Sequence, residues 1–236
     1  ESPLSEENQN HLQKANELYD KSLFLAAETL LEKIIEEQFF LESPQNLLLT
    51  EVKFKKALCG IRLDREKAHF PLLVFVKENP ITPFTNLANI ELASYYYNDQ
   101  DYKRALQYFS KVDLEDLSNE RYSEMMFKKA YCHFVRKDFG VVESILSQIL
   151  HLNNEYTIPA KYYYAMSLYF NEDLEGAVAG FREIEREESY ENRIPYYISQ
   201  ILFKEEKYEE LLDYGNKVVQ KPSTLNIKEI RGLLGQ

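Results

Sequence analysis

A block of sequence recurs about every 35 residues along this chain, and it constrains the fold more than any other feature. The block is clearest around Tyr102, which serves as an anchor. A small residue lies nine positions before it, and larger apolar residues lie seven and ten positions after it. The anchors of the other blocks are Phe24, Glu66, Phe139, Leu174 and Tyr208, of which Glu66 gives the loosest fit. Such a recurrence predicts a stack of similar structural units.

The match holds position by position, which a chance period would not produce. Nine residues before the anchors every residue is small: Ala15, Ala57, Ala93, Ala130, Ala165 and Ser199. Ten residues after the anchors every residue is aliphatic: Ile34, Val76, Val112, Ile149, Ile184 and Val218. Seven residues after them the side chain is large and apolar except in the last block: Leu31, Leu73, Phe109, Leu146, Phe181 and Gly215. The small side chain would let two helices cross closely, and the others would fill the core between them.

These residues resemble the tetratricopeptide repeat family, a helix-turn-helix unit of roughly 34 residues. The resemblance implies an all-α fold, a right-handed superhelix (α-solenoid) formed by one array over residues 1–236. We expect repeats at 8–43, 50–81, 86–119, 123–156, 158–191 and 192–225, with a truncated seventh repeat at 226–236. The second repeat departs most from the family pattern, because His69 stands where alanine is usual and Pro71 falls inside its expected second helix.

The charge of the chain argues against nucleic acid as its partner. The formal net charge is −11, from 39 acidic and 28 basic residues, whereas phosphate binding requires a basic face. No apolar run approaches the roughly 18 residues that a transmembrane helix needs. The sequence therefore predicts a chain without a transmembrane segment that does not bind nucleic acid.

No constellation of catalytic or metal-binding residues is present in the sequence. The histidines are dispersed, and they stand at His11, His69, His133 and His151. Neither a His-Glu-x-x-His motif, a Cys-x-x-Cys pair, a Gly-x-Ser-x-Gly elbow nor a phosphate-binding glycine loop occurs. Cys59 and Cys132 fall at the same buried phase of first helices two repeats apart, which predicts core thiols and no disulfide. We expect a non-enzymatic protein without a metal or cofactor.

The resemblance implies that the first helix of each repeat lines a concave groove, through residues 12, 8, 5 and 4 before the anchors. In the last three repeats these phases are mostly aromatic, and the predicted partner-binding residues are Phe127, Tyr131, Phe134, Tyr162, Met166, Tyr169, Phe170, Tyr196, Gln200 and Phe203. Packing between neighbouring repeats would also explain this stripe. Tyr131, Met166 and Gln200 point most directly into the predicted groove, so their burial would favour packing and their exposure would favour binding.

Two functions remain open at the level of sequence. The first is an interaction scaffold that holds a peptide segment or a partner helix in the groove. The alternative is a carbohydrate-binding or glycan-uptake accessory protein that uses the aromatic rings, although the chain contains no Trp. A clamp for chaperone tails, known in this family, is disfavoured because the corresponding phases of the first and third repeats supply no cation. Arg62, Arg193 and Lys204 are isolated from one another.

Tyrosine runs add a narrower resemblance. Tyr95-Tyr96-Tyr97-Asn98, Tyr162-Tyr163-Tyr164-Ala165 and Pro195-Tyr196-Tyr197-Ile198 resemble the large exported repeat proteins of Bacteroidetes-type bacteria. That resemblance implies a periplasmic or cell-envelope location, with the cytoplasm as the alternative. The chain starts at Glu1 without Met, which is compatible with a removed leader, and it stops at Gln236 inside an apolar helix-like segment. We expect further repeats to follow in the parent protein.

Overall fold

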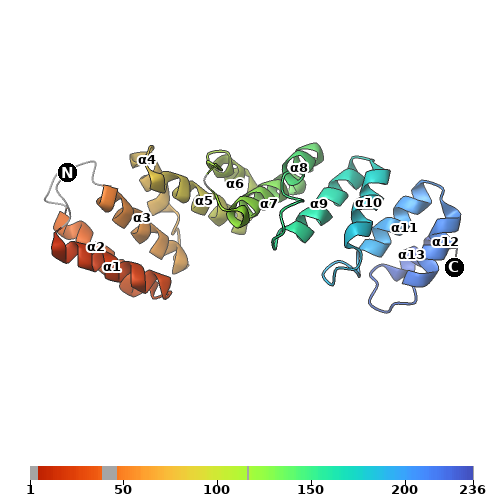
Figure 1. Cartoon of the computed structure of the whole chain (residues 1–236), viewed down its shortest axis with the longest axis horizontal. Helices are drawn as coiled ribbons and strands as arrows, with labels where there is room; N and C mark the ends of the chain where they lie inside the picture. Colours follow the sequence, from red (N-terminus) through yellow and green to blue (C-terminus); the bar gives the residue numbers. More distant parts are fainter. Residues whose placement is uncertain (1–4, 39–46, 116, 236) are drawn as a thin grey trace. The chain divides into compact units, whose positions relative to one another are not determined.

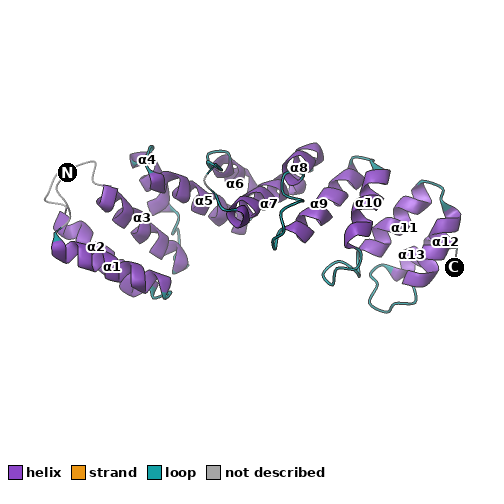
Figure 2. Ribbon diagram, viewed as in Figure 1, coloured by secondary structure: helices purple, strands orange, loops and turns teal. Residues whose placement is uncertain are grey.

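The computed structural model describes residues 5–38, 47–115 and 117–235, and within them every regular element is an α-helix (Figures 1 and 2). The thirteen helices of this described part are α1 (Glu6–Asp20), α2 (Phe24–Gln38), α3 (Leu47–Arg62), α4 (Phe70–Glu78), α5 (Pro83–Asn98), α6 (Tyr102–Phe109), α7 (Asn119–Val135), α8 (Phe139–Leu146), α9 (Thr157–Phe170), α10 (Leu174–Ile184), α11 (Ile194–Lys204), α12 (Tyr208–Val218) and α13 (Ile227–Leu233). The predicted all-α class is confirmed. The predicted end of the first repeat, residue 43, lies outside the described residues.

The predicted anchors mark where the second helices begin. Five of these helices start at an anchor: α2, α6, α8, α10 and α12. Before each of them the first helix ends in the same turn, in which the residue two before the anchor has a left-handed φ between 58° and 66°. The next N–H then reaches back to a carbonyl five residues earlier, as from Asp101 to Tyr96 at 2.9 Å. This Schellman arrangement satisfies carbonyls that the helix end leaves unpaired, and it reverses the chain.

In the fifth repeat the two helices meet where both side chains are small. Ala165 of α9 is fully buried. A Cβ built on Gly180 of α10 would lie only 3.0 Å from the Cβ of Ala165. The residues at the same phase in the other repeats are also buried: Ala15, Ala57, Ala93, Ala130 and Ser199. The small residue nine before each anchor therefore sets how closely the helices cross.

The second repeat is shifted relative to the predicted frame. Its second helix, α4, starts at Phe70 and not at Glu66, and Lys67 adds a second left-handed residue to the turn with φ 58°. The buried residues of α4 are Leu72 and Phe75, each one position before the predicted core phases. Pro71 lies in the first turn of α4, where its missing N–H breaks no helical hydrogen bond. The predicted register of this helix was therefore wrong by one residue.

The chain divides into two compact units, Glu1–Leu114 and Glu115–Gln236. In the N-terminal unit, α1 packs on α2, α2 on α3, and both α3 and α4 contact α5. In the C-terminal unit, α8 packs on α9 and α10 on α11, while α7 and α9 also touch. Each unit therefore stacks helix pairs in chain order. That the repeats form one continuous array over 1–236 stays a prediction.

The last helix explains why Gly215 breaks the repeat pattern. α13 packs on α11, and its Ile230 is fully buried. A Cβ built on Gly215 of α12 would lie 2.7 Å from a methyl carbon of Leu234, just after α13. Leu234 therefore occupies space that a larger side chain fills in the other repeats.

Both cysteines lie in the core, as expected. Cys59 and Cys132 are free thiols with no exposed surface. Burial raises the pKa of Cys59 to about 11 and that of Cys132 to about 12. Neither thiol is thus a thiolate near neutral pH. Separately, no helix within the described ranges is long and apolar enough to cross a membrane.

Enlarging the small residue at the helix crossing should destabilise the C-terminal unit. Ala165→Leu places a bulky side chain against Gly180, so we expect the free energy of unfolding to fall by about 1–3 kcal/mol. Ala179→Leu is the control, because Ala179 is exposed on α10. Urea unfolding followed by circular dichroism measures both. Equal stability of Ala165→Leu and the wild type would contradict the close crossing.

Glycine should have opposite effects at two glutamines of the third repeat. Gln100 has φ 59° in the turn, so Gln100→Gly relieves a left-handed conformation and should raise the free energy of unfolding by about 0.5–1 kcal/mol. Gln107 is exposed within α6, so Gln107→Gly should lower it by about 0.5 kcal/mol. The pair is compared by urea unfolding, and a loss of stability in Gln100→Gly would show that the turn differs.

Candidate functional site

The ten predicted partner-binding residues all lie on α7, α9 and α11 of the C-terminal unit, but they differ in accessibility. Tyr162 and Met166 are only 6% and 5% exposed. Tyr162 stacks on Tyr190 with ring centroids 4.6 Å apart. Tyr162 and Met166 both belong to the buried core of this unit. The prediction of Tyr162 and Met166 as binding residues was wrong, since a partner cannot reach a buried side chain. Packing explains them.

Three predicted residues come together around a hollow at the turn end of α7 and α9. The hollow has a volume of about 460 Å³. Its lining consists of Tyr131, Phe134, Val135, Lys137, Phe139, Tyr163 and Phe170. Val135 and Phe170 are 45% and 46% exposed. We call this set the aromatic hollow.

Contacts between the rings hold the aromatic hollow in place. Phe134 lies at the centre, with ring centroids 4.9 Å from Tyr163 and 5.5 Å from Phe139 in edge-to-face arrangements. Phe139 and Phe170 stack face to face at 4.7 Å and 17°. Such pairs stabilise one another beyond simple burial. The ring contacts therefore brace the walls of the hollow against one another.

Four members of the hollow lie outside the predicted binding residues. Val135 lies at a groove phase, four before the anchor Phe139, but is not among the ten predicted residues. Phe139 is an anchor and had been assigned to packing, although the ring of an anchor lies beside the turn where the hollow opens. Tyr163 lies eleven before the anchor Leu174, at a phase that was not considered. Lys137 is the left-handed residue of the turn. An aromatic anchor such as Phe139, which closely follows an apolar residue at the end of the first helix such as Val135, is the sequence signal that could have predicted this side of the hollow.

Gln200 and its neighbours form a chain of hydrogen bonds. The hydroxyl of Tyr169 donates to Oε1 of Gln200 at 2.9 Å. Nε2 of Gln200 donates to the hydroxyl oxygen of Tyr196 at 2.6 Å. All three side chains are half-buried. Gln200 thus ties α9 to α11, and its amide already has partners on both sides.

Of the remaining predicted residues, Phe127 is half-buried and Phe203 is exposed. Phe127 is half-buried against Tyr156 and Tyr163, with ring centroids 5.7 Å and 5.8 Å away. Phe203 is exposed at the end of α11, and its ring lies 5.9 Å from that of Tyr208. An exposed apolar side chain at the end of the first helix, as at Val135 and Phe170, therefore occurs again in the sixth repeat at Phe203.

The aromatic hollow is almost uncharged. Burial raises the pKa of Tyr163 to about 12, and the neighbouring Tyr131 adds to the increase. The phenol of Tyr163 therefore remains neutral at physiological pH. Lys137 is the one charged side chain in the lining. The hollow suits an apolar group, with a single cation at its rim.

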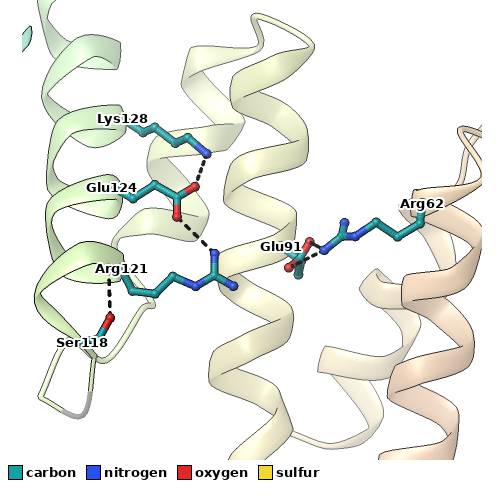
Figure 3. Close-up of polar contacts among 6 residues, drawn as sticks. All are labelled: Arg62, Glu91, Ser118, Arg121, Glu124 and Lys128. Carbon is teal, nitrogen blue, oxygen red and sulfur yellow. Dashed lines mark hydrogen bonds and ion pairs between the residues drawn. The ribbon is translucent and has the colours of Figure 1, made fainter. Parts of the chain in front are cut away.

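The cations expected at the groove phases are paired within the chain. Arg62 of α3 donates to both carboxylate oxygens of Glu91 on α5, at 2.9 and 2.8 Å (Figure 3). Lys204 lies 3.2 Å from Glu172. A clamp for a carboxylate needs several converging cations without acidic partners. These pairs agree with the expectation that such a clamp is disfavoured.

A similar pairing occurs on α7. Glu124 accepts hydrogen bonds from Lys128 at 2.6 Å and from Arg121 at 3.1 Å, while Ser118 caps the helix (Figure 3). Burial alone would raise the pKa of Glu124, but the hydrogen bonds and charges of the two cations outweigh it and lower the pKa. Glu124 is thus an ionised structural carboxylate.

Within the described part of the chain, no three His, Cys, Asp or Glu side chains converge as metal ligands would. His133 pairs with Asp138 at 3.1 Å, and the same carboxylate also contacts Arg136. That pair lies at the C-terminal end of α7.

Solved structures with the same arrangement of helices are known. A tetratricopeptide repeat protein from Parabacteroides merdae has a TM-score of 0.59 at 15% identity, covering 96% of this chain and 85% of that one. Pseudomonas aeruginosa PilF has a TM-score of 0.58 at 14% identity, covering 95% and 96%. PilW, a type IV pilus biogenesis factor, has a TM-score of 0.53 at 15% identity, covering 96% and 99%. This chain has the tetratricopeptide repeat fold.

Comparisons by sequence add no further relative. No protein-family model matches the chain, and no curated protein matches it. Because the solved structures are only 14–15% identical to this chain, they show its fold and nothing about its partners.

Removal of the Gln200 amide should loosen the contact between α9 and α11. Gln200→Ala deletes two half-buried hydrogen bonds, and we expect the free energy of unfolding to fall by about 1–2 kcal/mol. Gln148→Ala is a matched control, because Gln148 also bonds a tyrosine hydroxyl, that of Tyr122, but in an exposed position. Urea unfolding should show little change for the control. Equal effects of the two variants would contradict a special role for Gln200.

Proposed function

We propose that this chain is a non-enzymatic protein-interaction scaffold that binds a peptide segment or a partner helix at the aromatic hollow. The observation that carries the proposal is the exposure of Val135 and Phe170 on the lining of one braced hollow. Large apolar side chains that gather at one exposed place usually mark an interaction site. The first helices of tetratricopeptide repeats line an extended concave binding surface, and the hollow lies at the end of two such helices.

The chemistry of the hollow indicates what a partner must present. Neutral aromatic walls favour an aliphatic or aromatic anchor side chain from the partner. Lys137 at the rim favours an acidic group next to that anchor. Phe203 and Tyr208 are exposed in the next repeat and offer a second apolar contact further along the partner. Both an extended peptide and a helix can place two anchors in this way.

Binding of a glycan is the second candidate function, and the ring geometry supports it less well. Sugars stack on open faces of aromatic rings. In the hollow, Phe139 and Phe170 each cover one face of the other, and Phe134 makes edge-to-face contacts with Phe139 and Tyr163. The amide of Gln200 is already hydrogen-bonded to two tyrosine hydroxyls, those of Tyr169 and Tyr196. These features favour a peptide over a carbohydrate.

We further propose a location in the periplasm or cell envelope, with the cytoplasm as the alternative. The resemblance of the tyrosine runs to exported Bacteroidetes-type repeat proteins supports this proposal. PilW, which shares the fold, is described as a type IV pilus biogenesis factor. Fractionation of the native host cells with an antibody against this chain would test the location.

Truncation of Phe170 should weaken partner binding without unfolding the chain. Peptides are selected from a displayed library against the wild-type chain, and their affinities are then measured by fluorescence anisotropy. Phe170→Ala removes one wall of the hollow, so we expect the Kd to rise about tenfold or more. Leu225→Ala is the control, because Leu225 is a similarly exposed apolar residue between α12 and α13 that does not line the hollow.

A glycan array probed with the same protein separates the two candidate functions. Peptide binding that depends on Phe170, together with a silent array, is the expected result. Glycan binding without peptide binding would overturn the scaffold function. Peptides that bind Phe170→Ala as tightly as the wild type would show that the hollow is not the site.

A further inference from the structure

Among the described residues that line the aromatic hollow, Lys137 carries the only charge, and its side chain is exposed. Within the described part of the chain its ammonium group makes no hydrogen bond and no ion pair. The other residues of the lining are aromatic or aliphatic, and none of them is a carboxylate. The apolar walls are thus accompanied by a positive charge that the lining does not compensate.

The charge of Lys137 is particular to the fourth repeat, although its backbone conformation is not. The residue two before the anchor is left-handed in each of the five regular turns, and these residues are Ser22, Gln100, Lys137, Glu172 and Glu206. Lys137 is the only cation among the five. The conformation of the turn therefore does not require a lysine, and the cation distinguishes the turn beside the hollow from the others.

Asp138 is the carboxylate nearest to Lys137 in sequence, and it is bonded elsewhere. Nδ1 of His133 lies 3.1 Å from Oδ2 of Asp138, and Nε of Arg136 donates to the same oxygen at 3.3 Å. The hydrogen bond from His133 is the main cause that lowers the pKa of Asp138, and Arg136 adds to it. Asp138 is therefore ionised at neutral pH. Within the described residues its ion pairs are those with His133 and Arg136, and none joins it to Lys137.

The same position is used differently in the neighbouring repeats. Asp101 and Asp173 also stand directly before a second helix, and each accepts a hydrogen bond from the backbone N–H three residues later, at 3.0 and 2.9 Å. These bonds cap α6 and α10. Asp138 makes no such bond to α8. Its side chain instead bonds back toward the end of α7, so it forgoes the stabilisation that an N-cap gives.

Two further carboxylates close to the hollow in sequence also have partners within the chain. Glu143 of α8 accepts a hydrogen bond from Nδ2 of Asn171 at 2.6 Å. Glu172, in the turn after α9, lies 3.2 Å from Nζ of Lys204. Neither forms an ion pair with Lys137 in the described ranges. A carboxylate supplied by a partner would therefore complement this lysine without displacing a bond inside the chain.

We propose that the aromatic hollow selects a peptide whose apolar anchor stands directly beside an Asp or Glu that pairs with Lys137. His133 and Arg136 set this preference as positioning residues, because they hold Asp138 away from that lysine. The inference rests on the function proposed above and specifies the chemistry of its partner. Because the whole chain carries a net charge of −11, the attraction for an acidic peptide is local to the rim of the hollow.

The experiment measures the preference for an acidic group directly. Peptides selected from a displayed library against the wild-type chain are each compared with a version in which Asp or Glu is replaced by Asn or Gln. We expect the amide version to have a Kd about threefold higher at low salt. Lys137→Gln should bring the ratio of the two Kd values to about one. Lys221→Gln is the matched control, because it removes an exposed lysine that does not line the hollow.

Arg136→Gln tests the positioning role. Without Arg136, Asp138 can turn to Lys137 and neutralise it, so the ratio should fall toward one, and His133→Phe should act in the same direction. The loss of a positive charge at position 136 could also lower the ratio by itself. The same change is therefore made together with Asp138→Asn, where we expect the ratio to stay at about threefold. Equal falls with and without Asp138→Asn would overturn the positioning role. Circular dichroism verifies that each variant is folded.

The outcomes separate this inference from the function on which it rests. Peptides that lose affinity for Phe170→Ala, but bind equally well in their acidic and amide versions, would support the hollow as a binding site and overturn the acid preference. A preference that survives Lys137→Gln would overturn the role of this lysine. A selection that enriches no peptide, or only peptides that bind Phe170→Ala as tightly as the wild type, would overturn both proposals.

Discussion

The close crossing of two helices over a small residue is the interaction on which the rest of this structure depends. At Ala165 the facing position is a glycine, and a single added carbon would already be crowded. The left-handed turn that follows each first helix fixes where the second helix starts. Together they determine which phases of each helix face inward. The positions at the turn end, such as Val135 and Phe170, are left partly uncovered by that same geometry.

Much of this architecture can be read from the sequence, because the crossing leaves a local signature. The small residue and the anchor belong to one repeat, and the distance between them is set by the helix and its turn alone. The anchors Phe24, Tyr102, Phe139, Leu174 and Tyr208 therefore coincide with helix starts. The register of the second repeat was not predicted, because the left-handed conformation of Lys67 has no side-chain signature.

The site was harder to predict, since it depends on contacts between repeats. Tyr131, Met166 and Gln200 share one phase, yet only Met166 is buried, and Gln200 is bonded to two tyrosines of different helices. What surrounds each residue is decided by the neighbouring repeat. Gly215 shows the same limit, because its reason for being small is Leu234, a residue beyond its own repeat. The phase of a residue within its repeat predicts which face of the helix carries it, but not which side chains of the neighbouring repeat contact it.

The aromatic hollow arises at a regular turn of the repeat, and Lys137 is the single charged residue of its lining.

Hydroxyl-radical footprinting with mass spectrometry tests most directly whether the aromatic stripe divides into packed and open residues. Sulfur reacts with hydroxyl radicals faster than phenyl rings do, so unprotected Met166 would be modified first. Because Met166 is 5% exposed and Phe170 is 46% exposed, Phe170 should be modified in the native chain, while Met166 reacts at its intrinsic rate only after unfolding. Rapid native oxidation of Met166, or protection of Phe170, would contradict the division.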